Sequence, residues 1–198
     1  MNDSTRTTTT RADDTRSALL RAGRELFAEQ GYDGASVRAI TSRADANLGS
    51  ITYHFGSKEA LYHEVLRSVV VPLRERVVEV VRLDGPALER LDAVVDAYFR
   101  HCAAHGDLPR FLMERIAAGQ VPPPPVALVM KSILGMLAGL IREGQERGSV
   151  RDGDPVLLSL SLVAQPVYLT LVQAPLREVL GLDLADPDGF ERLVDHAR

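Results

Sequence analysis

Apolar side chains recur along this chain at steps of three and four residues, which is the spacing of one face of an α-helix. The two-residue alternation typical of β-strands does not persist over any useful length. The sequence therefore predicts an all-α fold. The clearest stripes are Leu19, Gly23, Leu26 and Phe27; Leu88, Leu91, Val95, Tyr98 and Cys102; and Val129, Met130, Ile133, Leu137 and Ile141.

Helix start and stop signals divide the chain into a tail and two helical parts. Residues 1–13 are polar, rich in threonine and without periodicity, so we predict a disordered tail. A helix that begins near Asp14 and ends before Gly31 opens a first domain, residues 14–56. A long helix capped by Ser57 opens the second, residues 57–198.

Prolines interrupt several of the helices expected in the second domain. Pro72, Pro166 and Pro175 each remove a backbone hydrogen bond, so we expect a kink or a break at each. Residues 120–125 (QVPPPP) are expected to be an extended connector before a helix over residues 126–147. Asp186 and Pro187 open a last short helix.

Residues 36–58 (SVRAITSRADANLGSITYHFGSK) predict two short helices joined by a tight turn. Ser36 is a good N-cap, and Asn47 can cap the second helix. In that helix Leu48, Ile51 and Phe55 share one face, which leaves polar residues on the others. Two short helices with this spacing are typical of a helix-turn-helix.

Two tracts around this motif, ITYHFGSKEAL (51–61) and LFAEQGYDGASV (26–37), resemble the DNA-binding domain of TetR-type transcriptional regulators. The resemblance covers roughly residues 15–65. It implies a TetR-like, three-helix DNA-binding domain followed by a larger helical domain for ligand binding and dimerisation. Asp45 stands where the family usually has a turn glycine, a position that tends to need a left-handed backbone.

The resemblance implies a regulator that binds a palindromic double-stranded DNA operator as a dimer, and most often a repressor. The second helix would enter the major groove with its N-terminal residues at the base edges. Arg38 would clamp a guanine or a phosphate, because its guanidinium can bond in two places. Arg6 and Arg11 in the tail are further candidates for DNA contact. The predicted DNA-binding residues are Ser36, Arg38, Leu48, Gly49, Ser50, Thr52, Tyr53, His54 and Lys58.

The family also implies a homodimer and a small-molecule effector. The uncharged helix from Asp154 to Gly181 and the helix from Asp186 (residues 154–198 together) are the expected dimer surface. The effector is expected to bind within the helical body, although each candidate residue could equally be ordinary core. The candidate lining residues are Tyr98, His101, Cys102, Met113, Met130 and Tyr168.

Two alternative functions remain open at this point. His101 and His105 lie one helical turn apart and could chelate a metal with Glu114, as in a helical metal-dependent enzyme. The helix-turn-helix could also bind proteins rather than DNA. No catalytic triad, phosphate loop or nucleotide motif is present in the sequence, so neither catalysis nor a cofactor is predicted.

Composition agrees with a cytoplasmic globular protein. Hydrophobic residues make up 45% of the chain, and the single cysteine, Cys102, excludes an internal disulfide. The net charge of −4 disfavours nucleic acid only weakly, because the docking face alone must be positive. Residues 156–176 are uncharged and long enough to span a membrane, but they contain prolines, glutamines and hydroxyls. We therefore expect a helix in the core and a subunit interface instead.

Overall fold

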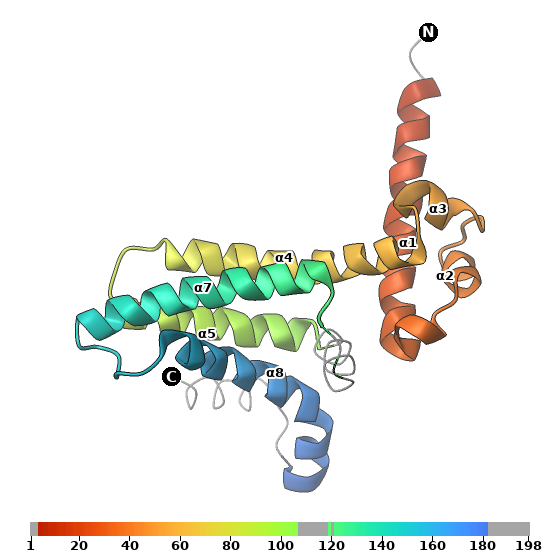
Figure 1. Ribbon diagram of the computed structural model, residues 1–198. Helices are drawn as coiled ribbons and strands as arrows, with labels where there is room; N and C mark the ends of the chain where they lie inside the picture. The colour runs from red at the N-terminus through yellow and green to blue at the C-terminus, as the bar shows by residue number, and fades with distance from the viewer. Residues whose placement is uncertain (1–3, 107–118, 120, 182–198) are drawn as a thin grey trace. The chain divides into compact units, whose positions relative to one another are not determined.

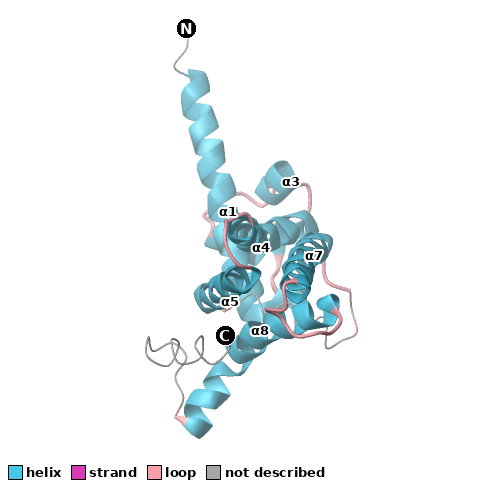
Figure 2. Cartoon of the chain, turned by 90° about the vertical axis from the view of Figure 1, so that its left-hand side faces the viewer, coloured by secondary structure: helices cyan, strands magenta, loops and turns pink. Residues whose placement is uncertain are grey.

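The computed structural model describes residues 4–106, 119 and 121–181, with side chains described from residue 13 onward. Every regular element within these ranges is a helix, which confirms the predicted all-α class (Figures 1 and 2). The chain divides into two compact units, Met1–Ser68 and Val69–Arg198. The division lies inside one long helix, whereas the sequence placed the domain boundary at its start.

The first unit holds α1 (Ser4–Gly34), α2 (Val37–Arg43), α3 (Ser50–Phe55) and the first part of α4 (Lys58–Val81). Both α2 and α3 pack against α1. Gly23 permits a close approach between α1 and α4, because a Cβ there would lie 3.3 Å from a methyl of Leu61. The buried core contains Leu19, Leu26, Phe27, Ile40, Ile51, Leu61 and Val65, as the apolar stripes predict.

The start of α1 differs from the prediction. Residues 4–13, expected to be a disordered tail, are helical, and the helix begins at Ser4 rather than near Asp14. No glycine or proline interrupts residues 4–13, and adding a turn to an existing helix avoids the cost of nucleation. The predicted stop is correct, because Gly31 leaves the helical conformation with φ 71° and ψ 178°.

The second unit holds the rest of α4 with α5 (Ala87–Ala104), α7 (Pro124–Glu146) and α8 (Pro155–Leu180), and the last three pack against one another. Val95 and Phe99 of α5 form a small cluster with leucines of α8. Arg74 of α4 donates a hydrogen bond to the Ser132 hydroxyl of α7 at 2.9 Å. Arg90 pairs with Glu143 of α7, which joins α5 to α7 by charge as well as by packing.

The prolines inside the helices of this unit do not break them. Pro72 lies within a continuous α4, and α8 likewise includes Pro166 and Pro175 without a break. The α7 helix begins at Pro124, inside the stretch expected to be extended, because a first-turn proline lacks only an N–H that would be unpaired anyway. Flanking turns of these long helices retain their own hydrogen bonds.

Two side chains assigned to inward stripes are on the surface. Leu88 is 46% exposed and Met130 is 37% exposed, whereas Val94 and Phe99 are buried in α5. The other residues of the two predicted stripes are buried, apart from the half-buried Tyr98, so the predicted inward faces are otherwise correct. Position 130 lies at the edge of the buried face of α7, beside Val129, which is buried.

α7 and α8 are both long and apolar enough to cross a membrane by length and composition alone. α7 is a core helix, with 44% of its apolar window buried, whereas only 11% of the α8 window is buried. Leu157, Tyr168 and Val179 of α8 are all more than half exposed. Within the described part of the chain, a long apolar surface on α8 is therefore uncovered, as expected for a subunit interface.

Candidate nucleic-acid interface

The helix-turn-helix forms where the sequence predicts it, with one change at the start of α3. The Ser36 hydroxyl accepts a hydrogen bond from the Ala39 N–H at 3.1 Å and caps α2 as expected. Asp45 has φ 49°, so the turn does require a left-handed residue. The predicted Asn47 cap is wrong, because α3 starts at Ser50 and Gly49 is its N-cap. The backbone carbonyl of Asn47, rather than its side chain, accepts from the Ser50 N–H at 2.9 Å.

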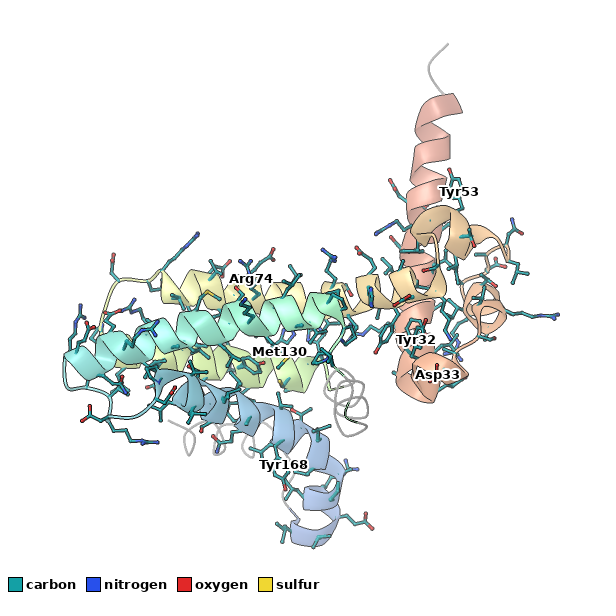
Figure 3. All side chains as sticks on the ribbon, in the orientation of Figure 1. Tyr32, Asp33, Tyr53, Arg74, Met130 and Tyr168 are labelled. Carbon is teal, nitrogen blue, oxygen red and sulfur yellow. The ribbon has the colours of Figure 1, made fainter. Side chains whose placement is uncertain are left out.

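One face of α3 is anchored and the other is open. Ile51 is 1% exposed and fixes α3 to the core, whereas Tyr53 is 81% exposed. Leu48, in the turn before α3, is 62% exposed. Thr52 is exposed, and a Cβ at Gly49 would meet no atom within 4 Å. Figure 3 shows Tyr53 directed away from the helices behind α3. The residues predicted to read bases are thus available on one outward surface.

Arg38 and Arg43 differ in their electrostatic surroundings, although both belong to α2. Arg43 forms an ion pair with Glu29 of α1 at 2.7 Å and lies 3.7 Å from Glu25. The hydrogen bond from Arg43 lowers the pKa of Glu29, and the same bond raises the pKa of Arg43. Arg38 is exposed and has no carboxylate partner in the described part of the chain. Arg38 therefore retains its charge for an external anion.

Lys58, the first residue of α4, is held by an aromatic ring rather than by an acid. Its ammonium lies 4.4 Å from the centroid of the Tyr32 ring, within the range of a cation–π contact. Sequence reasoning did not identify Tyr32 as part of this site. Tyr32 follows the break at Gly31 and so belongs to no periodic stripe.

The remaining predicted DNA contacts are exposed or half-buried residues at the ends of α2 and α3. His54 is half-buried and meets the Tyr53 ring edge-on, with 4.8 Å between ring centroids. Ser36 is exposed beside Arg38 at the start of α2, and Ser50 is half-buried at the start of α3. The guanidinium carbon of Arg16 lies 5.1 Å from the centroid of the Phe55 ring. This contact holds the end of α3 against α1.

The predicted effector-binding residues come together only in part. Tyr98 and Cys102 are neighbours on α5, and burial raises the pKa of both side chains, that of Cys102 to about 12. His101 is half-buried, whereas Met130 and Tyr168 are exposed on α7 and α8 (Figure 3). Met113 lies outside the described residues. These side chains do not line one described cavity.

Two surface cavities of the second unit are lined by other residues. One, of about 460 Å³, lies between α5, α7, the loop after α7 and α8, with Leu91, Ile141 and Leu162 as its apolar wall and Arg151 at its rim. The other, of about 540 Å³, is bordered by charged residues of α4 and α5, among them Arg76 and Asp96. Their lining residues come from positions that carry no motif in the sequence.

The histidine pair on α5 is arranged for stacking. The rings of His101 and His105 are nearly parallel, with centroids 4.3 Å apart, and Nδ1 of His105 lies 3.0 Å from the His101 carbonyl oxygen. Glu114, the suggested third ligand, lies outside the described residues. Within the described ranges, no group of three or more His, Cys, Asp or Glu side chains could hold a metal ion.

Two family models match the chain over most of its length. Residues 19–65 match the N-terminal domain of bacterial regulatory proteins of the tetR family. Residues 88–198 match the tetracyclin repressor-like C-terminal domain. The first match contains the helix-turn-helix, and the second contains α5, α7 and α8.

Individual proteins agree with these matches. The HTH-type transcriptional repressor NicS of Pseudomonas putida is 29% identical over 186 residues, covering 88% of this chain and 84% of that protein. The fold matches the regulator FadR of Bacillus subtilis in complex with stearoyl-CoA (TM-score 0.70, 20% identity, covering 91% of this chain and 96% of that one). It also matches AibR in complex with isovaleryl coenzyme A and operator DNA (TM-score 0.73, 16% identity, covering 92% and 95%).

Each of the two family models matches residues within one of the two compact units of the fold. Regulators of this kind are soluble, bind operator DNA and small-molecule effectors, and are homodimers. The chain belongs to the TetR family of bacterial transcriptional regulators.

Proposed function

We propose that this chain is a repressor that places α3 of each protomer in the major groove of a palindromic operator. The observation that carries the proposal is the division of α3 into a buried face at Ile51 and an outward face at Thr52 and Tyr53, with the exposed Leu48 just before the helix. A helix fixed in this way presents its side chains at low entropic cost on binding.

The outward residues suit distinct parts of the duplex. The methyl groups of Leu48 and Thr52 can contact the thymine C5 methyl, and hydroxyls can bond either base type. Gly49 leaves room for the backbone to approach the DNA, since a Cβ at this position would meet no described atom within 4 Å. Arg38 and Lys58 supply positive charge without a bound carboxylate, so they are assigned to phosphate or guanine. Ser36, Tyr53 and His54 are assigned to the phosphate backbone.

Release from DNA is proposed to follow from effector binding in the second unit. An effector shifts the protein away from the operator only by binding the non-operator conformation more tightly. Two structures of the same fold hold CoA thioesters, stearoyl-CoA and isovaleryl coenzyme A. Acyl-CoA thioesters are therefore the effector class we propose to test first. The protein is proposed to act in the cytoplasm and to lack enzymatic activity.

Substitution of the two arginines of α2 tests the DNA surface. A duplex selected by the parent protein from a random-sequence pool serves as the operator, and affinity is measured by fluorescence anisotropy over a range of salt concentrations. Arg38→Ala should weaken binding at least tenfold, since a guanine or phosphate contact is lost in each protomer. The slope of log K against log salt should fall by about 2 for two lost phosphate contacts.

Arg43→Ala is the matched control, because Arg43 is already paired with Glu29. It should leave the affinity and the salt slope close to those of the parent. The circular dichroism spectra of both variants report whether the fold is retained. A folded Arg38→Ala variant with the affinity of the parent would show that this face of α2 does not bind DNA.

A further inference from the structure

We propose that Tyr32 is a positioning residue for DNA binding, whose ring holds the Lys58 ammonium where it can contact a phosphate. The inference rests on the proposed phosphate contact of Lys58. It adds a residue of α1 that lies outside the helix-turn-helix to the DNA-binding machinery.

Lys58 occupies a position that is unfavourable for a cation. It is the first residue of α4, a helix of 24 residues, and the N-terminus of a helix carries a partial positive charge. The Ser57 hydroxyl already caps this end by accepting from the Ala60 N–H at 3.0 Å. No carboxylate in the described part of the chain pairs with Lys58. The Tyr32 ring, 4.4 Å from the ammonium, is the group that offsets the repulsion.

Tyr32 is itself fixed by the core. After the left-handed turn at Gly31, its ring returns toward α1 and α4 and lies 4.9 Å from the Tyr62 ring and 6.0 Å from the Phe27 ring, between centroids. Tyr62 is 3% exposed and Phe27 is 0% exposed. An aromatic series thus extends from the centre of the unit to the surface, and Lys58 lies at its outer end.

An aromatic ring and a carboxylate have different consequences for a DNA-binding lysine. A carboxylate would neutralise the ammonium, as Glu29 does for Arg43, and would compete with phosphate. The ring restricts the flexible side chain but leaves its net charge intact, and an ammonium has three N–H donors to share. Lys58 therefore loses less conformational freedom when it contacts a phosphate.

Four variants of the full-length chain test the coupling between the two residues. They are Tyr32→Leu, which removes the ring, Tyr32→Phe, which retains it, Lys58→Met, and the double variant Tyr32→Leu with Lys58→Met. Affinity for the selected duplex is measured at several salt concentrations. Lys58→Met should lower the salt slope by about 2 for the dimer. Tyr32→Leu should weaken binding roughly tenfold, because the Lys58 side chain of each protomer must then be ordered when the protein binds DNA. Tyr32→Phe should bind DNA with an affinity within about twofold of that of the parent.

The double variant separates positioning from general support of the fold. If Tyr32 acts through Lys58, Tyr32→Leu should change affinity less than twofold in the Lys58→Met background. An equal loss in both backgrounds would overturn the inference and leave the phosphate contact of Lys58 in place. If Lys58→Met instead binds DNA with the affinity and salt slope of the parent, Lys58 does not contact a phosphate. That result would overturn both the proposed contact and the inference about Tyr32.

The chain offers a second test that does not depend on the leucine variant being folded. It contains only two lysines, Lys58 and Lys131, and Lys131 is exposed on α7. In the parent labelled with isotopic lysine, the Lys58 side-chain methylene protons next to the ammonium should shift upfield of those of Lys131, because they lie over a ring. Tyr32→Phe should keep the shift. Coincident lysine signals in the unbound parent would show that the contact is absent in solution and would overturn the inference.

Discussion

Among single residues, Cys102 and Tyr98 on α5 have pKa values raised by their surroundings. Burial raises the pKa of the Cys102 thiol to about 12, and the hydrogen bond with Thr170 opposes that shift only in part. Burial also raises the pKa of Tyr98, and the nearby Cys102 raises it further. Both groups are therefore neutral in the folded protein at physiological pH, and both resist ionisation.

These shifts predict loss of stability at alkaline pH. Above about pH 9 the unfolded chain releases the Cys102 proton while the folded chain keeps it, so the free energy of unfolding falls until about pH 12. For one thiol the fall is at most about 1.4 kcal/mol per pH unit. Urea unfolding of the parent and of Cys102→Ala between pH 8 and pH 11 measures it. The variant should lose stability less steeply, and identical pH dependence in the two proteins would contradict the assignment.

The sequence predicted residue features that depend on local backbone conformation. It did not predict features that depend on contacts between distant residues. The left-handed turn at Asp45 followed from the glycine that the family usually has there, and φ is 49°. The pairing of Arg43 with Glu29 joins residues 14 positions apart on different helices. No local pattern distinguishes Arg43 from Arg38, so only the structure could show which arginine keeps a free charge.

At the scale of elements, the caps hold the DNA-binding helices in place. Ser36 caps α2 and is also proposed to contact phosphate, so its two roles must be separated. Ser36→Ala should lower the free energy of unfolding by about 1 kcal/mol and also weaken DNA binding. Ser36→Asp keeps a capping oxygen but adds a negative charge.

The aspartate variant should therefore be close to the parent in stability but should bind DNA more weakly, because its carboxylate repels phosphate. Thermal unfolding and anisotropy titrations on the two variants measure the two effects independently. Operator binding by Ser36→Asp equal to that of the parent would mean that Ser36 is a cap alone.

Several element boundaries were predictable from a capping residue or a glycine, although Asp14 and Asn47 do not mark the helix starts predicted for them. Ser36, Ser57 and Asp154 accept backbone N–H groups at the helix starts as expected. The α1 start and the continuity of α8 through Pro166 were not predictable, because a long helix tolerates a weak or interrupted stretch when its other turns are stable. The candidate base-reading positions came from the motif, whereas the burial of Phe99 and the exposure of Met130 depend on packing between helices.

At the scale of the whole molecule, the uncovered face of α8 predicts where two chains meet. Tyr168, 62% exposed on α8, is a suitable position to introduce a charge. Tyr168→Glu should shift the protein from dimer to monomer, because a buried unpaired carboxylate opposes association. Operator affinity should fall in parallel, since one protomer reaches only one half-site.

Leu128→Glu is the matched control, because Leu128 is 70% exposed on α7 and lies outside the expected dimer surface. Sedimentation velocity at several concentrations should show a dimer for this control and for the parent. A Tyr168→Glu protein that remains a dimer would place the interface elsewhere.

We propose that the two α3 helices of a dimer, each fixed by Ile51 and open at Thr52 and Tyr53, both read DNA. A structure of the full-length chain bound to its selected duplex tests this most directly through the separation of the two α3 helices. Both helices should lie in the major groove, with centres ~34–36 Å apart or a multiple of that distance, on one side of the duplex. A complex in which α3 faces away from the DNA, or in which the two α3 helices are out of phase with the helical repeat, would contradict this proposal.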